Sequence, residues 1–188
     1  MSDPVLRAFL ECQLAQGMAL ARDSDILELF PVDGNPPQRY IASYRARGLI
    51  QNDRGEVVEF EKCDIGIWLP DDYLRHVNPA QVLCYLGPAP RPHHPNIRPP
   101  FICMHLRPGT PLVDLLYTCF ELWTYNLYAT HDEGLNHAAS QWVRNQPAGR
   151  FPVDRRSLKR KPMSVRVEPA GPAEPIAGGA SGRRQERR

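Results

Sequence analysis

Proline is concentrated in one stretch of the chain, where it excludes regular secondary structure. Residues 87–100 contain Pro88, Pro90, Pro92, Pro95, Pro99 and Pro100. Proline lacks the backbone N–H donor and fixes φ, so this stretch can form neither a helix nor a central strand. We predict a long, stiff loop here. Loops of this length inside a compact domain usually carry function.

The composition predicts one globular domain followed by a tail. The chain has 188 residues, 42% of them hydrophobic, which is enough for one domain with a core. We expect no transmembrane segment, because no apolar run approaches 18 residues. Residues 1–21 contain Glu11 and Gln13 and only one basic residue, Arg7. This pattern favours an amphipathic helix over a signal peptide.

Short apolar segments separated by turns predict an antiparallel sheet. A helix should begin at Asp3-Pro4, where a capping side chain precedes proline, and end near Arg22. Four strands should follow it, at residues 26–31, 40–44, 57–69 and 81–86. The apolar phase changes inside the third strand, which predicts a bulge or break near Glu61-Lys62. Sequential short strands favour a meander with helices on one face, so the class is α+β.

The C-terminal part predicts two more helices and then a tail. Apolar residues at helical spacing follow Pro111 as far as Trp123, and a last helix should span residues 135–146. The domain should therefore cover residues 1–146. Residues 147–188 should form a disordered basic tail, rich in Arg, Pro, Gly and Ala. Residues 150–188 carry 11 Lys/Arg and 4 Asp/Glu, whereas residues 1–149 carry 12 and 17.

The cysteines point to a reducing compartment and to one candidate nucleophile. There are five, with no CxxC pair, so a disulfide scaffold is not expected and the cytoplasm is the default location. Cys103 alone lies outside an apolar periodic element, directly after the proline-rich loop. Exposure and a suitable thiolate pKa are what a reactive cysteine needs.

Asn96, in the same loop, carries side-chain N–H donors. It precedes Cys103 by seven residues, so a rigid loop can fold it back beside the sulfur. An amide in that place can stabilise the oxyanion that forms when a nucleophile attacks a thioester. Both residues also have a purely structural alternative. Cys103 could be a packed cysteine at a strand end, and Asn96 could be an ordinary turn residue.

These residues resemble the ubiquitin-conjugating enzymes. The tripeptide His94-Pro95-Asn96, followed by Ile102-Cys103, is similar to that family's hallmark. The order of helix, four-stranded meander, active-site loop and two helices also matches, over about residues 1–146. The detail is closest to divergent bacterial members, which are encoded beside an activating-enzyme homologue and a ubiquitin-like protein. Several such gene clusters are associated with defence against phage.

The resemblance implies a carrier mechanism. Cys103 would accept the C-terminus of a ubiquitin-like protein from an activating enzyme as a thioester, and a lysine of a target protein would then attack it. Asn96 would stabilise the oxyanion or order the loop. His94 and Pro95 would hold the loop structurally. Asp132 or Glu133 would be the gate that positions the incoming amine. The step needs no metal or organic cofactor, and the expected partners are proteins rather than nucleic acid or a membrane.

The chain departs from the family pattern in two places. The Asn-to-Cys gap is one residue shorter than in eukaryotic members, and residues 107–111 replace the family's Trp-Ser-Pro. Three other functions stay open. The domain could bind ubiquitin-like proteins without catalysis, or Cys103 and His94 could serve a cysteine hydrolase. The irregularly spaced His93, His94, Cys103 and His105 could also hold zinc, although zinc prefers ligands in tight pairs.

Overall fold

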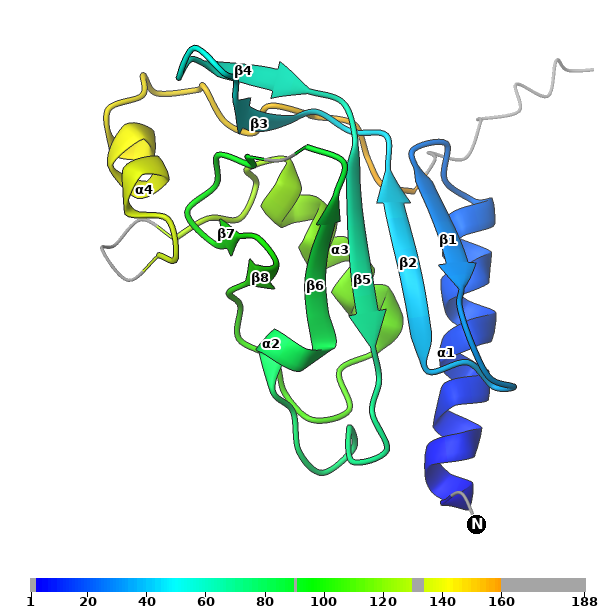
Figure 1. The fold of residues 1–188 in the computed structure, drawn as a ribbon. Helices are drawn as coiled ribbons and strands as arrows, with labels where there is room; N and C mark the ends of the chain where they lie inside the picture. Colours follow the sequence, from blue (N-terminus) through cyan, green and yellow to red (C-terminus); the bar gives the residue numbers. More distant parts are fainter. Residues whose placement is uncertain (1–2, 90, 130–133, 160–188) are drawn as a thin grey trace, which may run out of the picture.

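The computed structural model describes residues 3–89, 91–129 and 134–159 (Figure 1). The helices are α1 (Pro4–Arg22), α2 (Pro79–Val82), α3 (Leu112–Trp123) and α4 (His137–Arg144). The strands are β1 (Leu27–Pro31), β2 (Arg39–Tyr44), β3 (Gly48–Gln51), β4 (Val57–Phe60), β5 (Cys63–Trp68), β6 (Leu83–Gly87), β7 (Ile97–Arg98) and β8 (Phe101–Ile102). No helix in this part of the chain is long and apolar enough to span a membrane.

The architecture is α+β, with an N-terminal helix and an antiparallel sheet, as the sequence predicts. The main sheet has the order β1-β2-β5-β6-β8-β7, and every neighbouring pair is antiparallel. β1, β2, β5 and β6 form the predicted meander. Helix α1 begins as expected, since the Asp3 side chain accepts a hydrogen bond from the Val5 amide at 2.9 Å.

The expected third strand is two strands that belong to different sheets. β4 ends at Phe60 and β5 begins at Cys63, so the predicted break at Glu61-Lys62 is confirmed. β4 pairs with β3 in a separate hairpin, which lies between β2 and β5 in the sequence but not in the main sheet. The sequence analysis missed β3, which is only four residues long. The start predicted for the fourth strand is also wrong, because Asn78 caps the short helix α2 and β6 begins only at Leu83.

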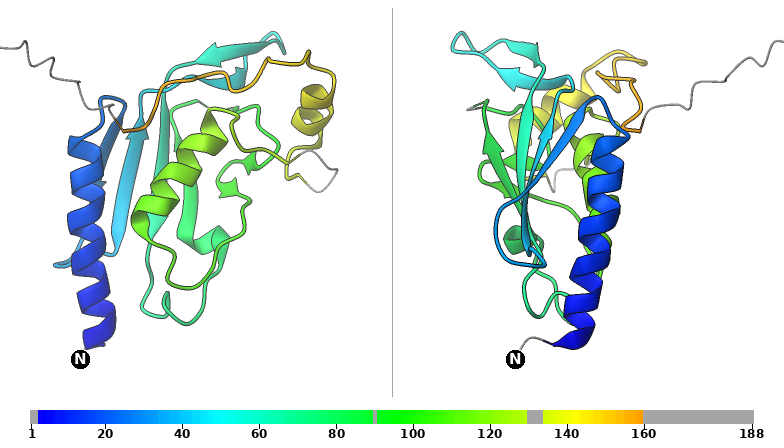
Figure 2. Two further views of the ribbon diagram at one scale, coloured as in Figure 1. Left: turned by 180° about the vertical axis from the view of Figure 1, so that it is seen from behind. Right: turned by 90° about the vertical axis from the view of Figure 1, so that its right-hand side faces the viewer.

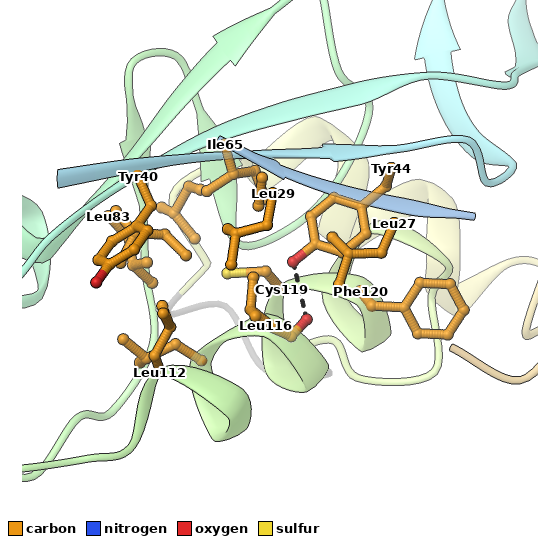
Figure 3. Close-up of a cluster of buried hydrophobic side chains, with 14 of the residues drawn as sticks. Leu27, Leu29, Tyr40, Tyr44, Ile65, Leu83, Leu112, Leu116, Cys119 and Phe120 are labelled. Carbon is orange, nitrogen blue, oxygen red and sulfur yellow. Dashed lines mark hydrogen bonds between the residues drawn. The ribbon is translucent and has the colours of Figure 1, made fainter. Parts of the chain in front are cut away.

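The core lies between the sheet and two helices on one of its faces. Seen from behind, α1 and α3 lie side by side in front of the strands (Figure 2). Alternate residues of β2 and β5 point toward these helices and are buried, among them Tyr40, Tyr44 and Ile65. The Tyr44 hydroxyl donates to the Leu116 carbonyl of α3 at 2.9 Å, which ties the sheet to the helix (Figure 3).

The packed part of the chain extends past the boundary expected at residue 146. Leu158 is buried in the main core, and the Val153 amide donates to the Thr124 carbonyl at 2.9 Å. The buried Asp154 carboxylate accepts hydrogen bonds from the Arg47 amide and the Arg156 guanidinium. Residues 147–159 therefore pack against the domain, with Val153 and Leu158 buried. The remainder of the expected tail lies outside the described residues.

Candidate functional site

The proline-rich loop is fixed along strand β3 before it reaches the site. The His93 amide donates to the Leu49 carbonyl at 2.8 Å, and the Gln51 amide donates to the Arg91 carbonyl at 2.9 Å. The last part of the loop contains the two-residue strand β7, which pairs with β8 directly after the loop, and both strands add to the edge of the main sheet. Backbone hydrogen bonds therefore fix the loop to the rest of the domain.

Two hydrogen bonds join Asn96 to Cys103. The Asn96 side-chain Nδ2 donates to the Cys103 carbonyl at 3.0 Å, and the Cys103 amide donates to the Asn96 carbonyl at 2.8 Å. The Asn96 Oδ1 accepts from the Ala129 amide at 2.8 Å. Asn96 therefore links Cys103 to the segment that follows α3. Within the described residues, one of the two N–H groups on Nδ2 has no acceptor, so it can donate to another group.

His94 and Pro95 support the backbone around Asn96. The His94 ring is buried, and its Nδ1 accepts from the Asn96 amide at 3.0 Å. Burial lowers the His94 pKa to about 3, so the ring is neutral at physiological pH and can act as an acceptor. The Pro95 carbonyl accepts from the Asn136 amide at 3.0 Å, which attaches the start of α4 to the loop. Both residues lie where a structural role would place them.

The Cys103 thiol is accessible, whereas most of the other cysteines are not. Cys63 and Cys119 are buried, and burial raises the pKa of both thiols, that of Cys119 to about 12. Cys84 is half-buried on β6. Cys12 is exposed on α1, which the sequence pattern did not distinguish from a buried helical cysteine. Cys103 is thus one of two exposed thiols among the five.

Cys103 lines a cavity of about 370 Å³. Its wall includes Asn96, Cys103, His105, Leu122, Leu127 and Tyr128. The apolar part of this wall comes from α3, from the segment after it and from Met104. Because the cavity lies directly beside an exposed thiol, a small acyl group on sulfur and an approaching nucleophile could both occupy it.

The other predicted roles have different outcomes. Asp132 and Glu133, the expected amine gate, lie outside the described residues. Within those residues, no group of three or more His, Cys, Asp or Glu side chains is placed to hold a metal ion. The His94 ring contacts the Asn96 amide and the Tyr125 ring, and in the described part of the chain it makes no hydrogen bond to Cys103 as a hydrolase base would. Sequence reasoning weighed His105 only as a zinc ligand and missed its place in the cavity wall.

Comparison with known proteins assigns no family to the chain. No protein-family model matches it, and no curated protein matches it significantly. The evidence for its function therefore comes from the site itself.

Proposed function

We propose that this chain is a carrier enzyme of the ubiquitin-conjugating type. It accepts a ubiquitin-like protein from an activating enzyme as a thioester on Cys103 and transfers it to a lysine amine of a target protein. The observation that carries the proposal is that the exposed Cys103 lines a cavity together with Asn96, whose side chain donates to the Cys103 carbonyl. The resemblance of residues 94–96 and 102–103 to the family's motif supports it.

The hydrogen bonds of Asn96 suit both steps of this reaction. In loading, the Cys103 thiolate attacks the thioester that the activating enzyme presents. In transfer, the amine attacks the thioester on Cys103, and negative charge develops on the carbonyl oxygen. An N–H donor that is fixed before the reaction stabilises that charge without reorganisation. The second N–H of Asn96 Nδ2 is such a donor, because the bonds to Cys103 and Ala129 already fix the amide.

The observations favour a carrier over the two alternatives. A domain that only binds ubiquitin-like proteins has no need of an exposed thiol beside an ordered amide. A cysteine hydrolase needs a base within hydrogen-bond reach of the sulfur, and the buried His94 ring instead accepts from the Asn96 amide. The likeness to bacterial members extends the proposal to the cytoplasm and to antiphage defence.

The loading step can be tested with a small acyl donor. A peptide ending in glycine, which leaves the carbonyl unhindered, is supplied as its 2-mercaptoethanesulfonate thioester to the wild-type chain, Cys103→Ser and Cys12→Ser. Cys12 is the matched control because it is the other exposed thiol. Intact mass and peptide mapping should show a reductant-sensitive adduct on Cys103 that persists in Cys12→Ser. A failure of Cys103 to acylate faster than Cys12 would overturn the proposal.

A further inference from the structure

Among the residues that the structure describes, the cavity wall contains one imidazole, that of His105. Cys103 and His105 are both exposed, whereas Met104 and Leu106 between and after them are half-buried against the main core. Met104 also lines the cavity, and Cys103 and His105 are the two exposed residues of these three. His105 lines the cavity together with Cys103 and Asn96.

The proposed reaction needs a proton acceptor at this place. A lysine amine has an ordinary pKa of about 10.4, so near neutral pH it must lose a proton before it can attack. Within the described part of the chain, the titratable side chains of the wall are Cys103, His105 and Tyr128, and no carboxylate lines the cavity. A tyrosine hydroxyl keeps its proton at neutral pH, and Cys103 carries the acyl group during transfer. The remaining group is an imidazole, the side chain best suited to exchange a proton near neutral pH.

The His105 ring is also free to meet a substrate. Over residues 3–89, 91–129 and 134–159, no hydrogen bond, ion pair or ring contact engages it. His93 and His94 differ in this respect. Both are buried, burial lowers the pKa of both, and their rings pack against Trp142 and Tyr125. The two histidines nearest to Asn96 in the sequence are therefore structural, and among the described histidines His105 is the one that lines the cavity.

We propose that His105 is a catalytic residue that accepts the proton of the attacking amine; this inference rests on the proposed carrier function. A ring nitrogen of His105 takes one proton from the substrate ammonium. The neutral amine attacks the thioester carbon, a C–N bond forms and the C–S bond breaks. The second proton on nitrogen leaves with sulfur, which returns as the Cys103 thiol. The protonated His105 then releases its proton to water.

The test separates loading from transfer. Wild type, His105→Ala and a control, His76→Ala, are loaded with the glycine peptide thioester, freed of excess thioester and mixed with free lysine. His76 is the matched control because it is exposed and does not line the cavity. Mass spectrometry follows the loss of the Cys103 adduct and the gain of acyl-lysine between pH 6 and pH 10.

We expect His105→Ala to load within about twofold of wild type and to transfer at least about tenfold more slowly at pH 7. The difference should shrink toward pH 10, where lysine loses its proton to solvent. Added imidazole should restore acyl-lysine formation in His105→Ala and leave wild type little changed. A purely structural role would show neither the pH effect nor the rescue.

Three results would overturn the inference. If His105→Ala loads and transfers at the wild-type rate, His105 accepts no proton and the carrier function still stands. If transfer is slow at every pH and imidazole does not restore it, His105 acts through structure alone. If wild type forms no adduct on Cys103, the carrier function and the inference fall together.

Discussion

Asn96 and Cys103 are joined by two hydrogen bonds. The Asn96 side chain donates to the Cys103 carbonyl at 3.0 Å, and the Cys103 amide donates to the Asn96 carbonyl at 2.8 Å. The proline-rich loop and the segment before α3 therefore hold a fixed relative position at the thiol. A third bond, from the Ala129 amide to Asn96 Oδ1, adds the segment after α3. One asparagine thus organises three separate parts of the chain around Cys103.

Asn96→Ala removes both side-chain hydrogen bonds and the candidate oxyanion donor. Transfer from Cys103 to lysine should slow by about tenfold or more, whereas loading should change less. The free energy of unfolding should fall by about 2 kcal/mol, since each lost hydrogen bond contributes about 1 kcal/mol. The control is Asn78→Ala, which removes the cap of α2. It should cost about 1 kcal/mol, because Asn78 accepts one hydrogen bond, from the Ala80 amide, and it should leave transfer intact. Equal transfer rates in the two variants would contradict the role of Asn96.

His94 should make the domain less stable in mild acid. Folding lowers its pKa from 6.5 to about 3, so between these values the unfolded chain binds a proton that the native state does not. The free energy of unfolding should therefore fall as the pH drops from about 6.5 toward 3. His94→Gln should flatten this dependence in urea titrations at several pH values. The burial of His93, whose pKa is also lowered, should leave part of the slope. The exposed control His76→Gln should keep the wild-type slope, and an unchanged slope in His94→Gln would refute the prediction.

The ionised Asp154 carboxylate should stabilise the packing of residues 147–159 against the domain. Burial alone would raise the pKa of this carboxyl, but hydrogen bonds from Arg156 and from the Arg47 amide lower it to about 2. The native state thus keeps the carboxylate ionised below the ordinary value of 3.8, and its stabilising contribution disappears as the pH falls from about 4 to about 2. Asp154→Asn should unfold more easily at pH 7 and lose less stability over that acid range. Asp53→Asn, at an exposed turn, should behave like wild type in both respects.

Gly48 allows β3 to lie against Trp123, whose Nε1 donates to the Ala46 carbonyl at 2.7 Å. A Cβ at residue 48 would overlap the Trp123 indole, which is buried and hydrogen-bonded. Gly48→Ala should therefore lower the free energy of unfolding by about 3 kcal/mol. At Gly66 an added Cβ would meet Leu86 Cδ1 at 3.4 Å, the end of a flexible and half-exposed side chain. Gly66→Ala should cost less than about 1 kcal/mol, and equal effects in denaturant titrations would contradict this reading.

The strongest local signals in the sequence predicted the elements that form. Asp3-Pro4 marks the start of α1, and the phase change at Glu61-Lys62 marks the gap between β4 and β5. β3 was missed because four residues do not establish a period. Composition predicts a tail over residues 147–159 because it averages over a segment and cannot show that Leu158 is buried in the core.

The candidate site shows the same division. The motif from His94 to Cys103 could be read from local spacing, because all of its residues lie on one loop. The bond from Ala129 to Asn96 and the place of His105 in the cavity wall depend on how distant segments fold together. The residues that flank Ala129 and His105 in the sequence show no pattern that predicts the hydrogen bond or the place in the cavity wall.

The most direct test of the carrier mechanism is a single turnover from a preloaded Cys103. The chain acylated with the glycine peptide is separated from free thioester, free lysine is added, and adduct, acyl-lysine and free peptide acid are quantified over time. The account predicts that acyl-lysine appears at the rate at which the Cys103 adduct disappears, with little free acid. Loss of the adduct mainly to free acid would contradict it and would favour the hydrolase.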